Sequence, residues 1–288
     1  MPQPLLAVDA PSMLFRAFYA LPDSIVGPDG KPVNALLGTA NLIVREVETH
    51  RPRAVVLCFG PDAASYRTEL YPAYHAEREA AMPDDLSPQF AAARDFFEAF
   101  GWTVATSDDL EADDLLGTYA RREAEAGGHA LLLTGDRDMY QCAAERVTVL
   151  YVKTGSKGGE EVTPEEVRER YGVDPEQVPD FIALRGDPSD GLPGAKGVGP
   201  KTAAELLRRH GNLEGVLENA IRERRPALRG ALLDAADDLR AFKDIATLRD
   251  AGVERPPDRE TEWADAAGAA RKHGMNRLAE RLDERVGS

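Results

Sequence analysis

The stretch SDDLEADDLLGTYARREAEAGGHALLLTGDRD, residues 107–138, decides the fold. Apolar residues recur at helical spacing after Ser107 and Asp108, either of which suits a helix N-cap, and they predict a helix over residues 110–126. The short apolar run at residues 129–134 is typical of a strand buried on both faces of a parallel sheet. A helix followed by such a strand predicts an α/β fold.

Five carboxylates lie at the two ends of this stretch, and they are Glu111, Asp113, Asp114, Asp136 and Asp138. The helix dipole favours one or two acids in a first turn, but it does not explain five that converge from both sides. Like charges this close raise one another's pKa unless a cation neutralises them. Hard oxygen ligands at this density indicate Mg²⁺ or Mn²⁺.

The composition of the 288-residue chain sets bounds on its class. A net charge of −15 argues by itself against a nucleic-acid partner, although a metal site built from eight carboxylates would account for much of the acidic excess. Two cysteines cannot form a disulfide framework, and no run of about 18 apolar residues is present. We therefore expect a soluble cytoplasmic protein with no membrane partner.

Two earlier apolar runs extend the same sheet. Residues 5–8 predict a strand with Asp9 at its carboxyl end, as Asp136 follows the later strand. Residues 54–59 predict another buried strand. Gly60 follows it, at a strand end where an acid is expected by analogy with Asp9 and Asp136. In open α/β sheets ligands bind beyond the carboxyl ends of the strands, so these ends predict the site.

Aromatic and cationic residues alternate over residues 65–78. This pattern suits stacking on unpaired bases and contact with a phosphate backbone, and it also fits an ordinary exposed amphipathic segment. The residues are Tyr66, Arg67, Tyr71, Tyr74, His75 and Arg78.

Residues 179–209 predict two short helices joined by a glycine-rich turn with lysines at its end. This arrangement resembles the helix-hairpin-helix element, which binds a DNA phosphate through backbone N–H groups without reading sequence. The alternative is a plain connection between helices. The DNA-binding candidates here are Lys196, Gly197, Val198, Gly199, Lys201 and Thr202.

In combination these motifs resemble the bacterial 5′-nuclease family of flap endonucleases and 5′→3′ exonucleases, also found at the N-terminus of bacterial DNA polymerase I. The motifs are VDAPSMLFRAF (8–18), YPAYHAER (71–78) with MPDDL (82–86), LEADDLLGTYA (110–120), TGDRDMYQ (134–141) and RGDPSDGLPGAKGVGPKTAAELL (185–207). The resemblance implies a PIN-like α/β nuclease core over residues 1–178, with a mostly parallel sheet and a helical arch at about 62–100. It also implies a helical region over residues 179–288, packed on the core and containing the hairpin, with K⁺ bound there.

Residue by residue, the resemblance implies that eight acids hold two or more Mg²⁺ or Mn²⁺ ions. They are Asp9, Glu111, Asp113, Asp114, Asp136, Asp138, Asp187 and Asp190. It further implies that Arg16 and Arg78, with His75, act on the phosphate and that Tyr74 contacts the nucleotide. Two positions depart from the family pattern, because Gly60 stands where an aspartate is usual and His75 where a lysine is usual.

The implied function is metal-dependent hydrolysis of DNA at 5′ flaps and 5′ ends, in replication and repair, by a monomeric stand-alone enzyme that also accepts RNA–DNA. One alternative is a branched-DNA binding protein with an impaired metal site, which Gly60 and His75 suggest. Another is a ribonuclease H-like activity of the same fold. A large gain in turnover on placing an aspartate at Gly60 would favour the binding protein.

Overall fold

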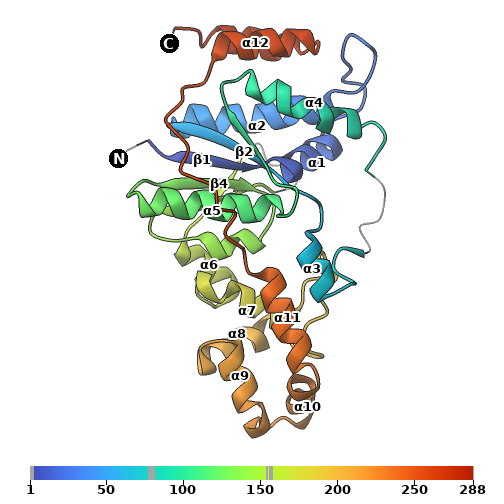
Figure 1. The fold of residues 1–288 in the computed structure, drawn as a ribbon, viewed down its shortest axis with the longest axis vertical. Helices are drawn as coiled ribbons and strands as arrows, with labels where there is room; N and C mark the ends of the chain where they lie inside the picture. Colours follow the sequence, from blue (N-terminus) through green and yellow to red (C-terminus); the bar gives the residue numbers. More distant parts are fainter. Residues whose placement is uncertain (1–2, 77–81, 154, 156–157, 288) are drawn as a thin grey trace.

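A computed structural model of the protein describes residues 3–76, 82–153, 155 and 158–287. Its centre is a sheet of strands in the order β3-β2-β1-β4-β5-β6 (Figure 1). All neighbouring pairs are parallel except β5 with β6. The strands are β1 (Leu5–Asp9), β2 (Ala54–Phe59), β3 (Thr103–Thr106), β4 (Ala130–Thr134), β5 (Val147–Tyr151) and β6 (Glu160–Val162). The predicted mostly parallel α/β sheet is confirmed.

Helices cover both faces of the sheet, as the continuous apolar strands require. One face carries α1 (Ala10–Ala20), α2 (Asn34–His50) and α4 (Ser87–Glu98), and the other carries α5 (Ala112–Glu125) and α6 (Pro164–Tyr171) (Figure 1). Alternate residues of β1 pack into separate cores, with Leu5 and Ala7 on the α5 side and Leu6 and Val8 on the α1 side. Each strand therefore contributes to two hydrophobic layers.

The predicted helix over residues 110–126 begins later than expected. The structure has α5 at Ala112–Glu125 with Glu111 as the N-cap, and the side chain of Asp114 accepts a hydrogen bond from the Glu111 backbone N–H at 3.2 Å. Ser107 instead accepts from the N–H of Leu110 at 3.0 Å within the preceding turn. The capping function thus belongs to the acidic motif itself.

Below the sheet in Figure 1 lies a helical region that contains the hairpin. The short 3-10 helix Asp138–Cys142 (η2) follows β4 in the sheet domain, and Pro175–Gln177 (η3) and Ala220–Arg222 (η4) lie in the helical region. Its α-helices are α7 (Val178–Arg185), α8 (Pro200–His210), α9 (Leu213–Asn219), α10 (Pro226–Asp234) and α11 (Ala236–Ala246), and a short α3 (Ser65–Leu70) lies beside α11. No described helix of the chain has the length and apolar character that crossing a membrane requires.

After α11 the chain returns along the sheet to its opposite side. There α12 (Trp263–Lys272) packs against α4, and α13 (Asn276–Asp283) packs against α12. Ala266 and Leu278 thereby join the core that includes Phe96 and Trp102. The boundary at residue 178 stays a prediction. The last two helices nevertheless belong to the packing of the core and not to that of the hairpin.

A buried ion-pair cluster fastens this returning segment. Glu123 on α5 is fully buried and contacts Arg53 before β2 and Arg255 on the returning segment, the latter at 2.8 Å. Arg53 also donates to the carbonyl of Pro256 at 2.8 Å. The two guanidinium groups lower the pKa of Glu123 despite its burial.

We expect Glu123→Gln to lower the free energy of unfolding by about 1.5–3 kcal/mol, because a hydrogen bond to a charged group has that value. Urea denaturation at neutral pH measures the change. The matched control is Glu98→Gln, which breaks an exposed pair with Arg94 at 3.1 Å and should cost less than about 1 kcal/mol. Equal losses for the two variants would contradict a special contribution from the buried cluster.

Candidate active site

The site lies where the order of the sheet reverses. β1 and β4 are neighbours at the centre, and the chain proceeds outward to β2 and β3 on one side and to β5 on the other. In such sheets the crevice beyond the carboxyl ends at this switch point is the usual binding site. Asp9 is the last residue of β1, and Asp136 follows β4 by two residues, so both carboxylates face this crevice.

A cleft of about 1320 Å³ opens here, and seven of the eight acids predicted to bind metal line it. They are Asp9, Glu111, Asp113, Asp136, Asp138, Asp187 and Asp190. Within the described residues, no three His, Cys, Asp or Glu side chains stand close enough together to hold a metal ion. The acids are spread over the cleft, an arrangement compatible with Mg²⁺, which usually keeps several waters and takes only one or two protein carboxylates together with substrate phosphates.

Four acids on the sheet side of the cleft have raised pKa values. Burial is the main cause for each, and it raises the pKa of Asp136 to about 6 and those of Asp113 and Asp138 well above the usual range. Burial also raises the pKa of Asp9, partly offset by hydrogen bonds from Ser12 and Thr134. Mutual repulsion adds to the shifts of Asp113, Asp136 and Asp138. Oδ1 of Asp113 has no hydrogen-bond partner among the described residues, so the donor set fits a divalent cation.

The opposite wall of the cleft is the loop that follows α7. Hydrogen bonds of 2.8 Å in both directions between the backbones of Asp187 and Leu192 close this loop. Asp187 accepts from Arg185 at 2.9 Å and from the backbone N–H of Ser189 at 2.9 Å. Repulsion from Asp187 and Asp190 contributes to the raised pKa of Asp138, so the acids of the two walls face each other across the cleft.

Arg16 is one of the three cations predicted to act on the phosphate. It extends from α1 into the cleft, and its Nη2 donates to the carbonyl of Gly135 at 2.5 Å. Its charge acts to lower the pKa of Asp9. Arg78 lies outside the described residues, so its predicted role stays a prediction.

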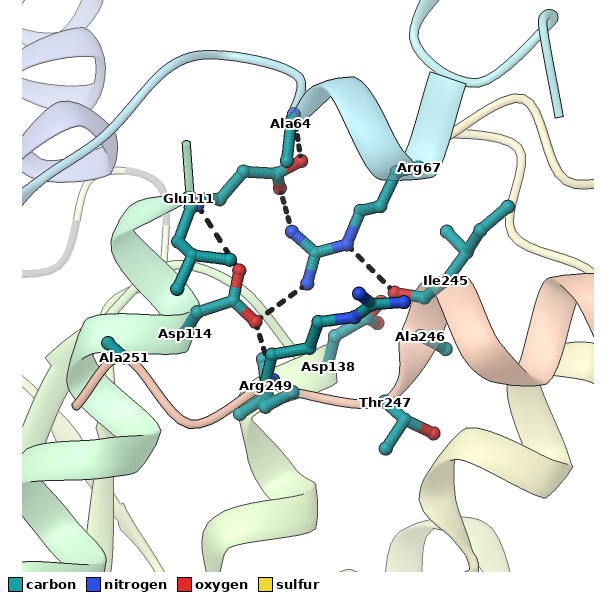
Figure 2. Close-up of polar contacts among 12 residues, drawn as sticks. Ala64, Arg67, Glu111, Asp114, Asp138, Ile245, Ala246, Thr247, Arg249 and Ala251 are labelled. Atoms are coloured by element: carbon teal, nitrogen blue, oxygen red, sulfur yellow. Dashed lines mark hydrogen bonds and ion pairs between the residues drawn. The ribbon is translucent and has the colours of Figure 1, made fainter. Parts of the chain in front are cut away.

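Arg67 occupies a position that sequence reasoning missed. Figure 2 shows this side chain reaching from α3 between the N-terminus of α5 and the end of α11. Its guanidinium lies 2.9 Å from Glu111 and 3.0 Å from Asp114, and its Nε donates to the carbonyl of Ile245 at 2.9 Å. Arg67 is only 3% exposed, so it joins three segments and does not present its charge to DNA.

Asp114 departs from the predicted metal set. It is fully buried and does not line the cleft. Its Oδ1 accepts from Arg67 at 3.0 Å and from the backbone N–H of Arg249 at 2.8 Å, while its Oδ2 accepts from the backbone N–H of Glu111 (Figure 2). Consecutive helical residues point about 100° apart, and here Asp113 lines the cleft while Asp114 does not. This geometry assigns Asp114 to holding α5 in place.

Tyr74 and His75 are turned inward. The Tyr74 hydroxyl donates to Glu111 at 3.1 Å, and its ring is 5% exposed with His75 stacked on it at 4.0 Å between ring centroids. Tyr74 therefore offers no open face to a base in this arrangement. Both ring nitrogens of His75 contact the protein, at the carbonyl of Asp62 and at the carboxylate of Asp190.

Gly60, the other position that differs from the family pattern, lies against the backbone that precedes α5. A Cβ atom at this position would stand 2.4 Å from the carbonyl oxygen of Leu110 and 2.7 Å from the nitrogen of Ala112. The two segments approach so closely only because position 60 has no side chain.

The hairpin residues form a turn between α7 and α8. Gly197 has a φ of 78°, and the N–H of Val198 bonds to the carbonyl of Ala195 at 3.0 Å. Val198 is buried, while Lys196 and Lys201 are exposed beside the first turn of α8. The structure thus places two cations next to a helix N-terminus, an arrangement that suits an anion.

Fold and site together define an α/β protein that gathers acids at the switch point of a parallel sheet and continues into a helical hairpin region. A family model described as 5′-3′ exonuclease, N-terminal resolvase-like domain, matches residues 4–172, and one described as 5′-3′ exonuclease, C-terminal SAM fold, matches residues 173–263. The chain belongs to the 5′-3′ exonuclease family.

Relatives and a solved structure agree with this membership. A 5′-3′ exonuclease of Streptomyces coelicolor is 42% identical over 73% of this chain and 73% of its own length. DNA polymerase I of Mycobacterium bovis is 36% identical over 88% of this chain, which spans only 28% of that longer protein. A bacteriophage T5 flap endonuclease, solved with DNA and metal ions, has the same fold, with a TM-score of 0.67 and 20% identity over 97% of this chain and 98% of that one.

Proposed function

We propose that this protein is a divalent-metal-dependent nuclease that hydrolyses DNA phosphodiester bonds at 5′ flaps and 5′ ends. The observation that carries the proposal is the set of half-buried acids at the switch point, with raised pKa values and an Asp113 oxygen that has no hydrogen-bond partner among the described residues. Holding like charges together in this way costs stability unless a cation binds them. The 5′-3′ exonuclease relative and the T5 flap endonuclease support the choice of substrate.

The acids that would hold Mg²⁺ or Mn²⁺ are Asp9, Asp113, Asp136 and Asp138 on one wall and Asp187 and Asp190 on the other. Divalent cations held there would supply Lewis acidity, which activates water and neutralises the leaving oxygen. Glu111 lines the cleft but contacts Ala64, Arg67 and Tyr74 through its two oxygens. We therefore assign Glu111 chiefly to positioning α5.

The cations of this chain act on the substrate phosphate. Arg16, which lies in the cleft beside Asp9, would stabilise charge that develops on the phosphoryl oxygens. Arg78 keeps the same role as a prediction from sequence. Products would carry 5′-phosphate and 3′-hydroxyl ends, because the bond to the 3′ oxygen breaks.

The hairpin would hold the duplex. Exposed Lys196 and Lys201 flank the N-terminus of α8, and backbone N–H groups at such an end bind phosphate without reading sequence. We assign Gly197, Val198, Gly199 and Thr202 to the same contact, with K⁺ as the ion the family resemblance implies there. A monomer that acts on DNA, and also on RNA–DNA, completes the proposal.

The rival function is a branched-DNA binding protein whose metal site has decayed. The geometry argues against it, because the acids of the cleft remain enclosed and repel one another. A binding protein without metal gains nothing from this cost, which neutral side chains would remove.

The test uses a labelled 5′-flap duplex, a blunt duplex and an RNA–DNA hybrid of the same sequence, each with Mn²⁺ and with EDTA. We expect cleavage of the flap with Mn²⁺ and none with EDTA. Tight flap binding without any cleavage in Mn²⁺ would establish the binding protein instead. Faster cutting of the hybrid than of the flap would favour the ribonuclease activity.

We expect Lys201→Ala to weaken DNA binding and to reduce the slope of log affinity against log salt by about 1, because one phosphate contact is lost. Fluorescence anisotropy over a range of salt concentrations measures both effects. The matched control is Lys272→Ala, an exposed lysine on α12 at the opposite end of the molecule (Figure 1). An unchanged slope for Lys201→Ala, or the same change for Lys272→Ala, would contradict the hairpin contact.

A further inference from the structure

His75 has an uncommon backbone conformation. Its φ is 55°, and among the described residues only Arg51 is the other non-glycine residue with a positive φ. Such residues are rare outside turns and persist where surrounding contacts hold them. His75 is 9% exposed, so the protein encloses this strained residue and does not leave it on a surface loop.

The imidazole ring bridges two other segments of the chain. Nδ1 lies 2.6 Å from the carbonyl oxygen of Asp62, and Nε2 lies 3.2 Å from Oδ1 of Asp190. A carbonyl oxygen and a carboxylate oxygen only accept hydrogen bonds, so both ring nitrogens donate here, as they do in the cationic form of the imidazole. The Tyr74 ring stacks on the imidazole with an interplanar angle of 15°, which fixes the ring plane as well as its two edges.

The backbone also connects His75 to the segment that contains Asp190. The N–H of His75 donates to the carbonyl of Asp190 at 3.1 Å. Gly191, with a φ of 74°, lies so close to this segment that a Cβ there would stand 2.7 Å from the carbonyl oxygen of Ala73. Residues 73–75 and the loop at 187–192 are therefore docked by main chain and side chain together.

The carboxylate that His75 contacts is under repulsion. Asp190 faces Asp136 and Asp138 from the other wall, and its charge helps to raise the pKa of both. A carboxylate in that position tends to turn away unless a donor holds it. Nε2 of His75 is such a donor, at 3.2 Å from Oδ1 of Asp190, when the ring carries a hydrogen on both nitrogens.

We propose that His75 is a positioning residue that holds Asp190 in place as a metal-binding carboxylate. The inference rests on the proposed function, and it replaces a direct contact between His75 and the phosphate with an action through Asp190. Donors that orient a metal-binding carboxylate typically change metal affinity by about 10- to 100-fold when they are removed.

Two substitutions separate the contacts of the ring. His75→Gln places an amide nitrogen near the position of Nε2 and can still donate to Asp190. His75→Asn places one near Nδ1, keeps the contact with Asp62, and suits the positive φ better than glutamine does. A purely structural role therefore predicts that asparagine is the better replacement, whereas positioning of Asp190 predicts glutamine.

The measurement is Mn²⁺ binding without DNA, followed by electron paramagnetic resonance of the free ion. We expect His75→Asn to weaken binding of one Mn²⁺ by about 10- to 100-fold, as Asp190→Asn does, and His75→Gln to retain most of the affinity. The control is His129→Gln, which contacts Thr148 at 3.1 Å at the opposite end of β4 and should bind Mn²⁺ like wild type.

The outcomes test two claims separately, the positioning role of His75 and the proposed nuclease function. Equal affinities for wild type and His75→Asn, or equal losses for the asparagine and glutamine variants, would overturn the positioning role while leaving the nuclease intact. Tighter binding by His75→Asn would show that His75 competes with the ion and would also overturn it. Absence of Mn²⁺ binding by wild type would instead overturn the proposed function.

Discussion

Asp136→Asn should lower the rate of flap cleavage with Mn²⁺ by about a thousandfold, since metal ions contribute several kcal/mol to such reactions and about 4 kcal/mol correspond to that factor. Asparagine keeps the size of the side chain and its Oδ1, which accepts from the backbone N–H of Asp138 at 2.8 Å. The loss would therefore come from the charge and not from a change of shape. Single-turnover kinetics on a 5′-flap substrate measure it.

The same substitution should stabilise the metal-free protein. Burial raises the pKa of Asp136 to about 6, so above that pH the folded state holds a charge that the unfolded state solvates better. Removing the charge should raise the free energy of unfolding at pH 8 in EDTA by about 1–3 kcal/mol, on the scale of 1.36 kcal/mol per pKa unit. Below the unfolded pKa the group is protonated in both states, so the gain should disappear near pH 4.

Asp109→Asn is the matched control, because Asp109 is exposed and does not line the cleft. It should leave both the cleavage rate and the stability close to those of wild type. Full cleavage by Asp136→Asn would overturn the assignment of the metal site. Lost cleavage together with lost stability would mean that the substitution damages the fold.

Gly60→Asp should reduce turnover by about a hundredfold, the effect that a displacement of roughly 1 Å has on an active site. Its Cβ would stand 2.4 Å from the carbonyl oxygen of Leu110 and 2.7 Å from the nitrogen of Ala112. These are backbone atoms at the start of α5, so the helix that carries Asp113 must move. Crowding of this kind also costs about 1–3 kcal/mol of stability.

Gly60→Ala separates crowding from charge, because alanine adds the Cβ without the carboxylate. We expect alanine and aspartate to lose turnover similarly. Gly230→Ala is the control for the loss of a glycine, since no atom of the described residues lies within 4 Å of a Cβ at that position. A gain with aspartate and a loss with alanine would show that the cleft lacks a carboxylate here and would revive the binding protein.

Sequence patterns predicted the elements that depend on local periodicity. The strand at residues 54–59 has the predicted bounds, and Asp9 and Asp136 stand at the strand ends as expected. These features follow because strands buried on both faces of a parallel sheet are continuous apolar runs, which can be recognised in the sequence. They place Asp9 and Asp136 without any knowledge of distant contacts.

The positions that sequence could not predict depend on contacts between distant segments. The sequence predicts that Arg67 is an exposed cation among aromatic residues. In the structure, the carbonyl of Ile245 and the acids of α5 enclose it. His75 likewise contacts Asp190, which lies more than a hundred residues away. One signal was available within the sequence, because neighbouring residues of a helix point about 100° apart, which favours different surroundings for Asp113 and Asp114.

The return of the chain to α12 and α13 has a mechanical consequence. The hairpin region leaves the sheet after α6 and rejoins it through the segment that Arg53 and Glu123 hold, so it is tethered to the core at two points instead of hanging from one linker. Two tethers restrict rotation of one body against the other. A duplex gripped at the hairpin would reach the acids at a set distance, and the frame of the protein would then determine which bond along the DNA is cut.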